Sequence, residues 1–511
     1  MENRFIGSSL LIRSHPLNRS VILAGRWWVV LGLAHVLWLA TITTALAESA
    51  TENSASSANS VTAEPASAAE VISNSLATSS SKSSTTQPAS APAASDSASE
   101  PESQSESEPF FGLQNHRLTG DWGGFRKKME AKGFTFNQTL ITNYVHNTRG
   151  GVSTRNSHRV PGKGIMELSL DTQAAGLWKG GKLYASNESG WSDGVDDKVG
   201  SLFSTNFNPI GNTPIRVREL FYEQKFIDDK LRFKFGRFDL GIDVDTNNYA
   251  NWEVEQFTNT ALIYTGNMPI PDFGLGAMVE VAPTDWMYVI LGAVDSYADA
   301  NTTGFRTTFH DKAHFFSALE FGLTPKWETR WGRLPGNYRF IVWYDPIPKE
   351  RFGPSVDEED AGGIISIAPR RKLKNNDTGF VFNMDQLIFK EKPNDDANDE
   401  GLGFFFRYGY APGSSNVIEH FWSAGLSYKG LVPTRDHDTL AFGVAQGLTS
   451  HRLRKFDDQV ARSETVYELY YRCMVFPWLA ITPDLQYIAS PGADKHARDS
   501  LFFGVRLVMT F

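Results

Sequence analysis

The sequence has little cysteine and no excess of positive charge. Cys473 is the single cysteine among 511 residues, which excludes an internal disulfide and any cysteine-rich metal site. The formal net charge is −9, and this argues against a nucleic-acid partner. After residue 50 no stretch approaches the roughly 20 consecutive apolar residues that a membrane-spanning helix needs. Strands that are apolar on one face only remain compatible with such a composition.

Catalytic signatures are also missing. Serine, histidine and aspartate residues occur without a nucleophile elbow, and no glycine-rich phosphate-binding loop is present. His310 and His314 stand four residues apart, but no H-E-x-x-H pattern accompanies them, so we expect structural roles for both. The sequence therefore predicts a protein that is not an enzyme and that uses no metal and no cofactor.

The clearest positive signal is an alternation of apolar and polar residues between Ser463 and Phe511. In the last segment one set of alternate positions contains Gly504, Arg506 and Thr510, and the other set is apolar. The apolar set is Leu501, Phe503, Val505, Leu507, Met509 and Phe511. Alternation over about ten residues is typical of a strand with one lipid-facing and one water-facing side. Strands of soluble sheets average only about five or six residues.

Similar patterns recur along the chain from residue 134 to its end. We expect strands near 134–146, 163–174, 181–191, 215–226, 230–240, 273–282, 286–295, 313–324, 337–345, 378–389, 401–411, 417–429, 438–448, 463–476, 478–488 and 500–511. Short connections such as 283–285 alternate with long ones such as 241–272, which is typical of outer-membrane barrels. The predicted fold class is therefore all-β, an antiparallel transmembrane β-barrel of about sixteen strands over residues 134–511. In its fifth strand we expect Leu231, Phe233 and Phe235 to face lipid.

The residues before the predicted barrel form three segments. Residues 1–47 combine several arginines with an apolar core and an A-x-A sequence at 45–47, the pattern of a cleaved signal peptide; an uncleaved anchor helix is the alternative. Residues 48–109 are rich in Ser, Ala, Thr, Glu and Pro, which predicts a disordered periplasmic leader. Residues 110–133 carry a short helical signal that Asp121 could cap and Gly133 could end.

Four motifs, in this order, resemble those of the OprB-type carbohydrate-selective porins. They are LTGDWGGFR at 118–126, ELFYEQ at 219–224 running into 231–238, the pattern of 464–471 with 483–492, and the terminal 504–511. The resemblance covers about residues 112–511. It implies a sixteen-stranded barrel in the outer membrane of a Gram-negative bacterium that passes sugars by facilitated diffusion. It also implies that the barrel assembly machinery recognises the terminal Phe511. The leader and the acidic segment 357–360 depart from the family pattern, and the latter could change selectivity.

A barrel of this size has an aqueous lumen, so selectivity must come from inward side chains and inserted loops. The candidates on strands are Glu167, Asp171, Arg216, Arg218, Arg232, Lys234 and Arg237. Arg216 and Arg218 share one strand with Glu219 and Glu223 but occupy opposite phases, so part of this set must lie near an interface or in a bulge.

The loop 241–272 supplies the other candidates, which are Asp243, Asp245, Trp252 and Glu253. Loops longer than about 12–15 residues are usually functional or disordered. We expect this loop to fold inward and to narrow the pore, with its carboxylates facing Arg232, Lys234 and Arg237 across water.

Other functions remain open at this point. The early arginines would also suit an anion- or phosphate-selective porin, or a general porin. A barrel enzyme and a structural barrel that tethers the envelope are further alternatives. The expected partners are sugars, outer-membrane lipid and the assembly machinery, with no nucleic acid. Whether protomers form a homo-oligomer is left open.

Overall fold

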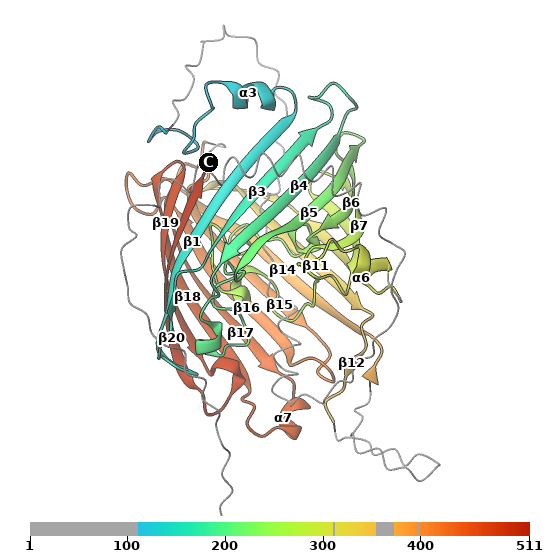
Figure 1. The fold of residues 1–511 in the computed structure, drawn as a ribbon, viewed down its shortest axis with the longest axis vertical. Coiled ribbons are helices and arrows are strands. Elements are labelled where there is room, and N and C mark those ends of the chain that lie inside the picture. Colours follow the sequence, from blue (N-terminus) through green and yellow to red (C-terminus); the bar gives the residue numbers. More distant parts are fainter. Residues whose placement is uncertain (1–110, 310–311, 354–372, 396–397) are drawn as a thin grey trace, which may run out of the picture. The chain divides into compact units, whose positions relative to one another are not determined.

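The computed structural model describes residues 111–309, 312–353, 373–395 and 398–511. The predicted signal peptide and leader, His310 and the acidic segment 357–360 lie outside these residues. Within them, the alternating segments form sixteen long antiparallel strands (Figure 1). They are β1 (Phe134–Gly151), β3 (Gly162–Asp171), β4 (Gly181–Trp191), β5 (Thr213–Phe226), β6 (Leu231–Phe238), β7 (Gly274–Thr284), β8 (Met287–Asp295), β9 (Phe315–Leu323), β11 (Gly332–Asp345), β14 (Asp377–Lys390), β15 (Gly401–Tyr410), β16 (Ile418–Lys429), β17 (Thr439–Thr449), β18 (Ser463–Phe476), β19 (Leu479–Ala489) and β20 (Arg498–Thr510).

Short elements lie in the connections between these strands. The short strands are β2 (His158–Arg159), β10 (Lys326–Thr329), β12 (Lys349–Glu350) and β13 (Leu373–Lys374). The helices are α3 (Phe125–Glu130), α4 (Asp196–Val199), η1 (Leu240–Ile242), α5 (Thr260–Ile263), α6 (Phe305–Phe309), α7 (Leu453–Phe456) and η2 (Pro491–Ala493). None of the helices in the described ranges is long and apolar enough to cross a membrane.

The barrel closes through β1, which pairs with β3 on one side and with β20 on the other. Phe136 is the partner of Leu168 in β3, and Thr142 is the partner of Leu507 in β20. Closure leaves no unpaired strand edge in contact with lipid, where unpaired backbone groups would be costly. The first and last strands of the barrel are therefore hydrogen-bonded neighbours, which confirms the predicted closed antiparallel barrel.

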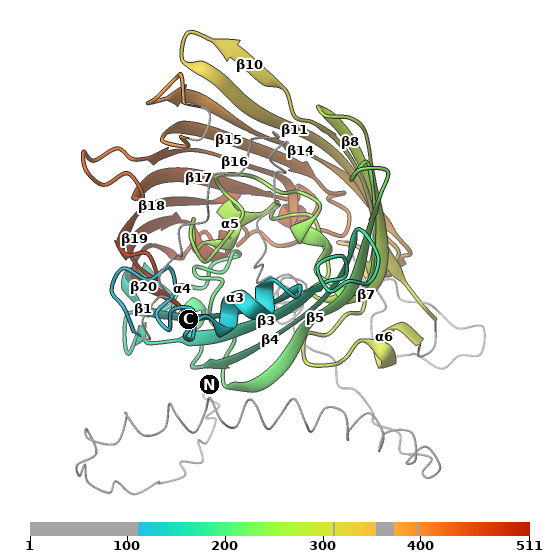
Figure 2. The same ribbon diagram turned by 90° about the horizontal axis from the view of Figure 1, so that it is seen from above.

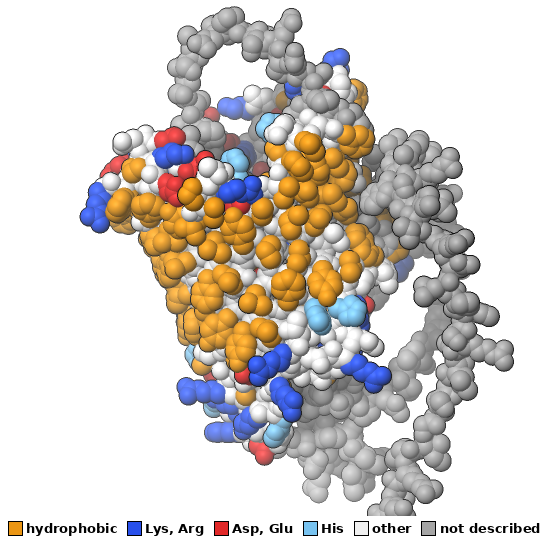
Figure 3. All heavy atoms as spheres, turned by 90° about the vertical axis from the view of Figure 1, so that its left-hand side faces the viewer, with side chains coloured by type: hydrophobic (Ala, Val, Ile, Leu, Met, Phe, Trp, Pro, Cys, Tyr) orange, Lys and Arg blue, Asp and Glu red, His pale blue; other side chains and the backbone are white. Residues whose placement is uncertain are grey.

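The alternation of residues separates the two faces of the wall. Leu291 and Leu319 are register partners in the middle of β8 and β9, and 52% and 47% of their surfaces are exposed. The neighbouring pair, Ile290 and Glu320, is buried on the inner face. Figure 3 shows the outward side chains as a broad hydrophobic surface with charged residues toward both ends. Such a surface suits the hydrocarbon layer of a membrane.

The first element of the described chain is fixed to the end of the barrel that carries the C-terminus, which we call the terminal end (Figure 1). Leu118 N donates to Thr510 O at 2.9 Å, and Arg126 Nη1 donates to Phe136 O at 2.8 Å. Helix α3 lies within the predicted helical segment. Asp121 does not cap it, because its carboxylate accepts from Gly124 N and Gly124 itself occupies the N-cap position.

Candidate functional site

The connection between β6 and β7, residues 239–273, lies inside the barrel (Figure 2). The chain turns inward directly after β6, where the Asp239 carboxylate accepts from Gly241 N at 2.8 Å and caps η1. Farther along, Glu468 of β18 accepts from Thr258 N at 2.6 Å and from Asn259 N at 3.0 Å. These contacts join the loop to β18, a strand far from β6 in the barrel order. We call residues 239–273 the inserted loop.

Asp243 anchors the inserted loop to the wall of β6. Its carboxylate lies 2.6 Å from Lys234 Nζ and 2.8 Å from Arg232 Nη1. Burial alone would disfavour the charged carboxylate, but the two cations outweigh it and lower the pKa of Asp243 below its usual value. The expectation that these groups face one another across water is wrong, because they form direct ion pairs.

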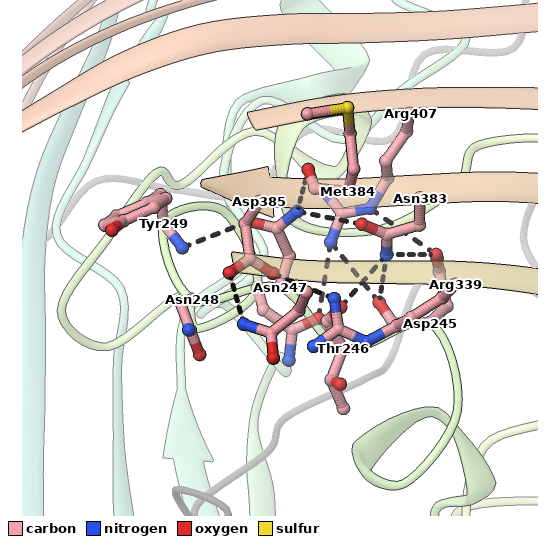
Figure 4. Close-up of polar contacts among 12 residues, drawn as sticks. Asp245, Thr246, Asn247, Asn248, Tyr249, Arg339, Asn383, Met384, Asp385 and Arg407 are labelled. Atoms are coloured by element: carbon pink, nitrogen blue, oxygen red, sulfur yellow. Dashed lines mark hydrogen bonds and ion pairs between the residues drawn. The ribbon is translucent and has the colours of Figure 1, made fainter. Parts of the chain in front are cut away.

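Asp245 and the opposite wall form a second anchor (Figure 4). The Asp245 carboxylate accepts from Asn383 Nδ2 of β14 at 2.7 Å and lies 3.5 Å from Arg407 Nε of β15. Arg407 also donates to Leu262 O at 3.2 Å. Asp245 has a φ of 64°, a left-handed conformation that these contacts hold in place. The loop thus contacts strands on both sides of the lumen.

Glu253 and Trp252 lie in the part of the loop nearest to β3 and β20. Glu253 Oε1 is 3.3 Å from Lys163 Nζ, and both side chains are buried. Arg506 Nη1 of β20 donates to Glu253 O at 2.5 Å. Trp252 is half-buried and packs against an apolar cluster that includes Ile141 and Val508. The loop carboxylates Asp243, Asp245 and Glu253 are therefore paired with bases on three different strands.

Arg216 and Arg218 both point into the barrel because β5 contains a bulge. The register with β4 passes from Ser186–Glu219 to Asn187–Val217, so Arg218 is the extra residue. Glu188 lies 2.7 Å from Arg216 Nε and 3.6 Å from Arg218 Nε. The bulge explains how Arg216 and Arg218 face the same side of the wall as Glu219, although they occupy the opposite phase of the strand. Sequence reasoning missed Glu188, although its inward phase on the neighbouring strand was a usable signal.

Arg237 is not a lumen residue, contrary to the expectation from sequence. It shares the phase of Phe233 and Phe235, whose exposed rings face outward as predicted, and its register partners are Leu220 and Leu275. Its guanidinium donates to Asp299 O at 3.1 Å and to Ala300 O at 3.3 Å. These residues belong to the β8–β9 connection, whose α6 lies outside the wall (Figure 2).

The two candidates on β3 have different positions. Glu167 faces inward and accepts a hydrogen bond from the Tyr184 hydroxyl. Asp171 is exposed at the end of the strand, and its carboxylate accepts from Ala174 N at 2.9 Å. Asp171 therefore stabilises a turn and does not line the lumen, because the strand ends there.

A second segment also enters the barrel, and the sequence reading did not identify it. Residues 192–212 join β4 to β5. Leu202 N donates to Glu464 Oε2 of β18 at 2.8 Å, and Phe207 N donates to Thr258 O of the inserted loop at 3.0 Å. Phe203 and Phe207 are buried in the same apolar cluster as Leu262. The length of this connection and its aromatic residues could have pointed to it.

Paired charges, and not metal ligands, dominate the interior. In the part of the chain that the structure describes, no group of three or more His, Cys, Asp or Glu residues could hold a metal ion. The two inserted segments narrow the lumen and are held by buried hydrogen bonds and ion pairs. Such an arrangement can discriminate between solutes by size and charge without any covalent chemistry.

Comparisons with known proteins agree with this geometry. Porin B of Pseudomonas aeruginosa is 25% identical over 432 residues, which are 78% of this chain and 92% of Porin B. The putative porin QuiX of Acinetobacter baylyi is 22% identical over 444 residues, 79% of this chain and 94% of QuiX. The high-pH structure of Pseudomonas putida OprB shares the fold, with a TM-score of 0.67 and 22% identity over 78% of this chain and 100% of that chain.

A family model decides the assignment. The model described as "Carbohydrate-selective porin, OprB family" matches residues 155–511, which is more than half of the chain. Family and fold both point to a channel rather than an enzyme. The chain therefore belongs to the OprB family of carbohydrate-selective porins and is a carbohydrate porin of the Gram-negative outer membrane.

Proposed function

We propose that neutral sugars cross the barrel through the space left beside the inserted loop, and that the paired charges there form the selective constriction. The observation that carries this proposal is the pairing of three loop carboxylates with wall bases. Asp243 contacts Lys234, Asp245 contacts Arg407, and Glu253 contacts Lys163. Both signs of charge are thus present at close range around the narrowed lumen.

Paired charges favour a neutral polyol over an ion. Sugar hydroxyls can both donate and accept, so they can exchange hydrogen bonds with water for hydrogen bonds with the pairs that keep part of their surface exposed, such as Arg232 with Glu280 and Arg472 with Glu255. A small ion meets both signs together and gains little net attraction. This also weighs against an anion- or phosphate-selective pore, because Arg216 and Arg218 face Glu188 and Arg232 faces Asp243. Each of these three arginines is already in an ion pair with a carboxylate.

Liposome swelling with solutes of matched size tests the proposal. Purified protein would be reconstituted, and uptake of glucose, gluconate and glucosamine compared. The proposal predicts fastest swelling with the neutral sugar and slower swelling with both charged analogues. Faster uptake of gluconate than of glucose would favour the anion-selective alternative, and equal rates for all of them would favour a general porin.

The C-terminal residue supports a proposal about assembly. Phe511 follows β20 directly, and its N–H donates to Gln138 O of β1 at 2.9 Å. The last residue of the chain is therefore part of the seam that closes the barrel. We infer that the barrel assembly machinery recognises this aromatic terminus before the seam forms.

A further inference from the structure

A cavity of about 530 Å³ lies at the terminal end of the barrel, next to the part of the inserted loop that contains Glu253. Three parts of the chain line it: the segment that contains α3, the ends of β1, β3 and β20, and the inserted loop at residues 252–255. Its volume is within the range of about 300–1,000 Å³ that is common for small-molecule sites. A solute that has passed the loop reaches this space before it leaves the lumen.

The charged groups that line the cavity are paired with one another or with the wall. Arg117 lies 3.5 Å from Glu130 and donates to Asn137 at 3.0 Å. Lys127 lies 3.4 Å from Asp121. These pairs leave little net charge for an ionic ligand, but they offer donors and acceptors at fixed positions. A ligand rich in hydroxyl groups and without charge fits such a lining.

Trp252 gives the cavity an aromatic wall. It packs on one side against the apolar cluster with Ile141 and Val508, and it lines the cavity together with Val254. Its Nε1 is buried and has no hydrogen-bond partner among the described residues. Because this atom has almost no accessible surface, the indole offers a ligand its ring and not its N–H. An indole beside fixed polar groups suits a sugar ring, which has apolar faces and a polar edge.

We propose that this cavity is a binding site for a small neutral saccharide, with Trp252 as its aromatic wall and the segment 116–130 as its cover. The choice of ligand class rests on the proposed function. The site lies between the inserted loop and the terminal end, so a sugar arriving from that end reaches it without crossing the constriction. A sugar arriving from the other end must first pass the loop. Binding kinetics should therefore differ between the two sides.

One-sided addition of sugar to channels inserted in a single orientation tests the site. Interruptions of the ion current by maltose or glucose would be recorded in planar bilayers. The wild-type protein should show a higher association rate for sugar added at the terminal end. Trp252→Leu should lower the residence time of those events about tenfold, and Trp252→Phe, which keeps a smaller aromatic ring, should fall between the two. Trp286→Leu, in an exposed turn between β7 and β8, is the matched control and should behave as wild type.

The possible outcomes distinguish failure of the proposed binding site from failure of the proposed function. Equal association rates from both sides in wild type, or unchanged residence times in Trp252→Leu, would overturn the site while sugar-driven swelling of liposomes still supported the porin. Wild-type protein that admits no sugar in the swelling assay would overturn both. The difference in association rate between the two sides is measured on the wild-type protein, so the site can be tested even if Trp252→Leu does not fold.

Discussion

The Nζ of Lys234 lies 2.6 Å from the Asp243 carboxylate, nine residues later in the chain. Between them, β6 ends and the chain turns inward through η1. The same carboxylate lies 2.8 Å from Arg232. One acidic residue therefore holds the start of the inserted loop against two bases of the wall that it has just left.

Asp243→Asn should loosen this anchor and leave two cations in the lumen without their carboxylate. We expect a loss of folding free energy of about 1.5–3 kcal/mol, the range for hydrogen bonds to charged groups, and a shift of ion selectivity toward anions. Reversal potentials in a salt gradient and denaturant titrations would measure both. Asp228→Asn is the control, because Asp228 is a highly exposed turn residue that pairs with exposed Lys179. Equal effects of the two substitutions would show that Asp243 has no special role.

The anchor should also persist in mild acid. Lys234 and Arg232 lower the pKa of Asp243, so the stabilisation is present above the unfolded pKa of about 3.9 and is lost only as the pH falls through the lower folded value. Asp243 should therefore stay ionised from about pH 7 to about pH 5, so any change of ion selectivity in that window should be the same in wild type and in Asp243→Asn. A change of selectivity in that window that Asp243→Asn abolishes would mean that Asp243 titrates there.

The lipid-facing positions of the strands allow a separate prediction. Leu319→Arg places a guanidinium near the middle of the lipid-facing wall and should cost about 2–4 kcal/mol. Leu319→Met keeps the site apolar and is the control. Folding into lipid vesicles at graded denaturant concentrations would measure the difference. If Leu319→Arg were no less stable than Leu319→Met, the register of β9 would be wrong.

Arg237 should hold the outer connection and leave transport unaffected. Arg237→Leu removes the hydrogen bonds to Asp299 O and Ala300 O, so segment 296–309 should become more susceptible to protease. Sugar block of the ion current should stay at the wild-type level, because this guanidinium faces away from the lumen. Weaker sugar block in Arg237→Leu would mean that Arg237 lines the pore.

Deletion of Phe511 tests the proposed assembly signal. The variant should be synthesised normally but reach the outer membrane as folded, heat-resistant barrel in lower amount. Phe511→Trp keeps an aromatic terminus and serves as the control. Wild-type yield from the deletion variant would mean that Phe511 is an ordinary aromatic residue of the membrane interface and not an assembly signal.

The sequence predicted the strands well because each strand carries its own period-two pattern. The same rule predicted that Phe233 and Phe235 face outward, and applied strictly it would have placed Arg237 on the same side. Asp171 was misplaced for another reason, since the last residue of a strand can serve a turn. Local patterns thus determined the strand register but not the role of each charge.

The interior could be predicted only in part. The length of the inserted loop indicated its inward course, but its contacts depend on strands far away in the sequence. Asp245 and Arg407 meet only because the barrel closes and brings β15 opposite β6. No local sequence pattern indicates this contact. Glu188 and the segment 192–212 carried local signals, an inward phase and a long connection, but their partners on other strands and on the inserted loop could not be read from the sequence.

If the inserted loop narrows the sugar pathway, as we propose, its removal must widen the pathway. Thr265 N donates to Asp245 Oδ2 at 2.9 Å, so a short Gly-Ser linker can replace residues 246–264 without moving the two ends of the loop. Segment 297–309, which includes α6 and lies outside the wall, can be shortened in the same way as a control.

The most direct measurement is the single-channel conductance of these variants with and without sugar, made on protein that still forms heat-resistant barrel. Replacement of 246–264 should raise the conductance and abolish block by sugar, while the shortened 297–309 variant should match wild type. Unchanged conductance and unchanged sugar block after replacement of 246–264 would contradict the account.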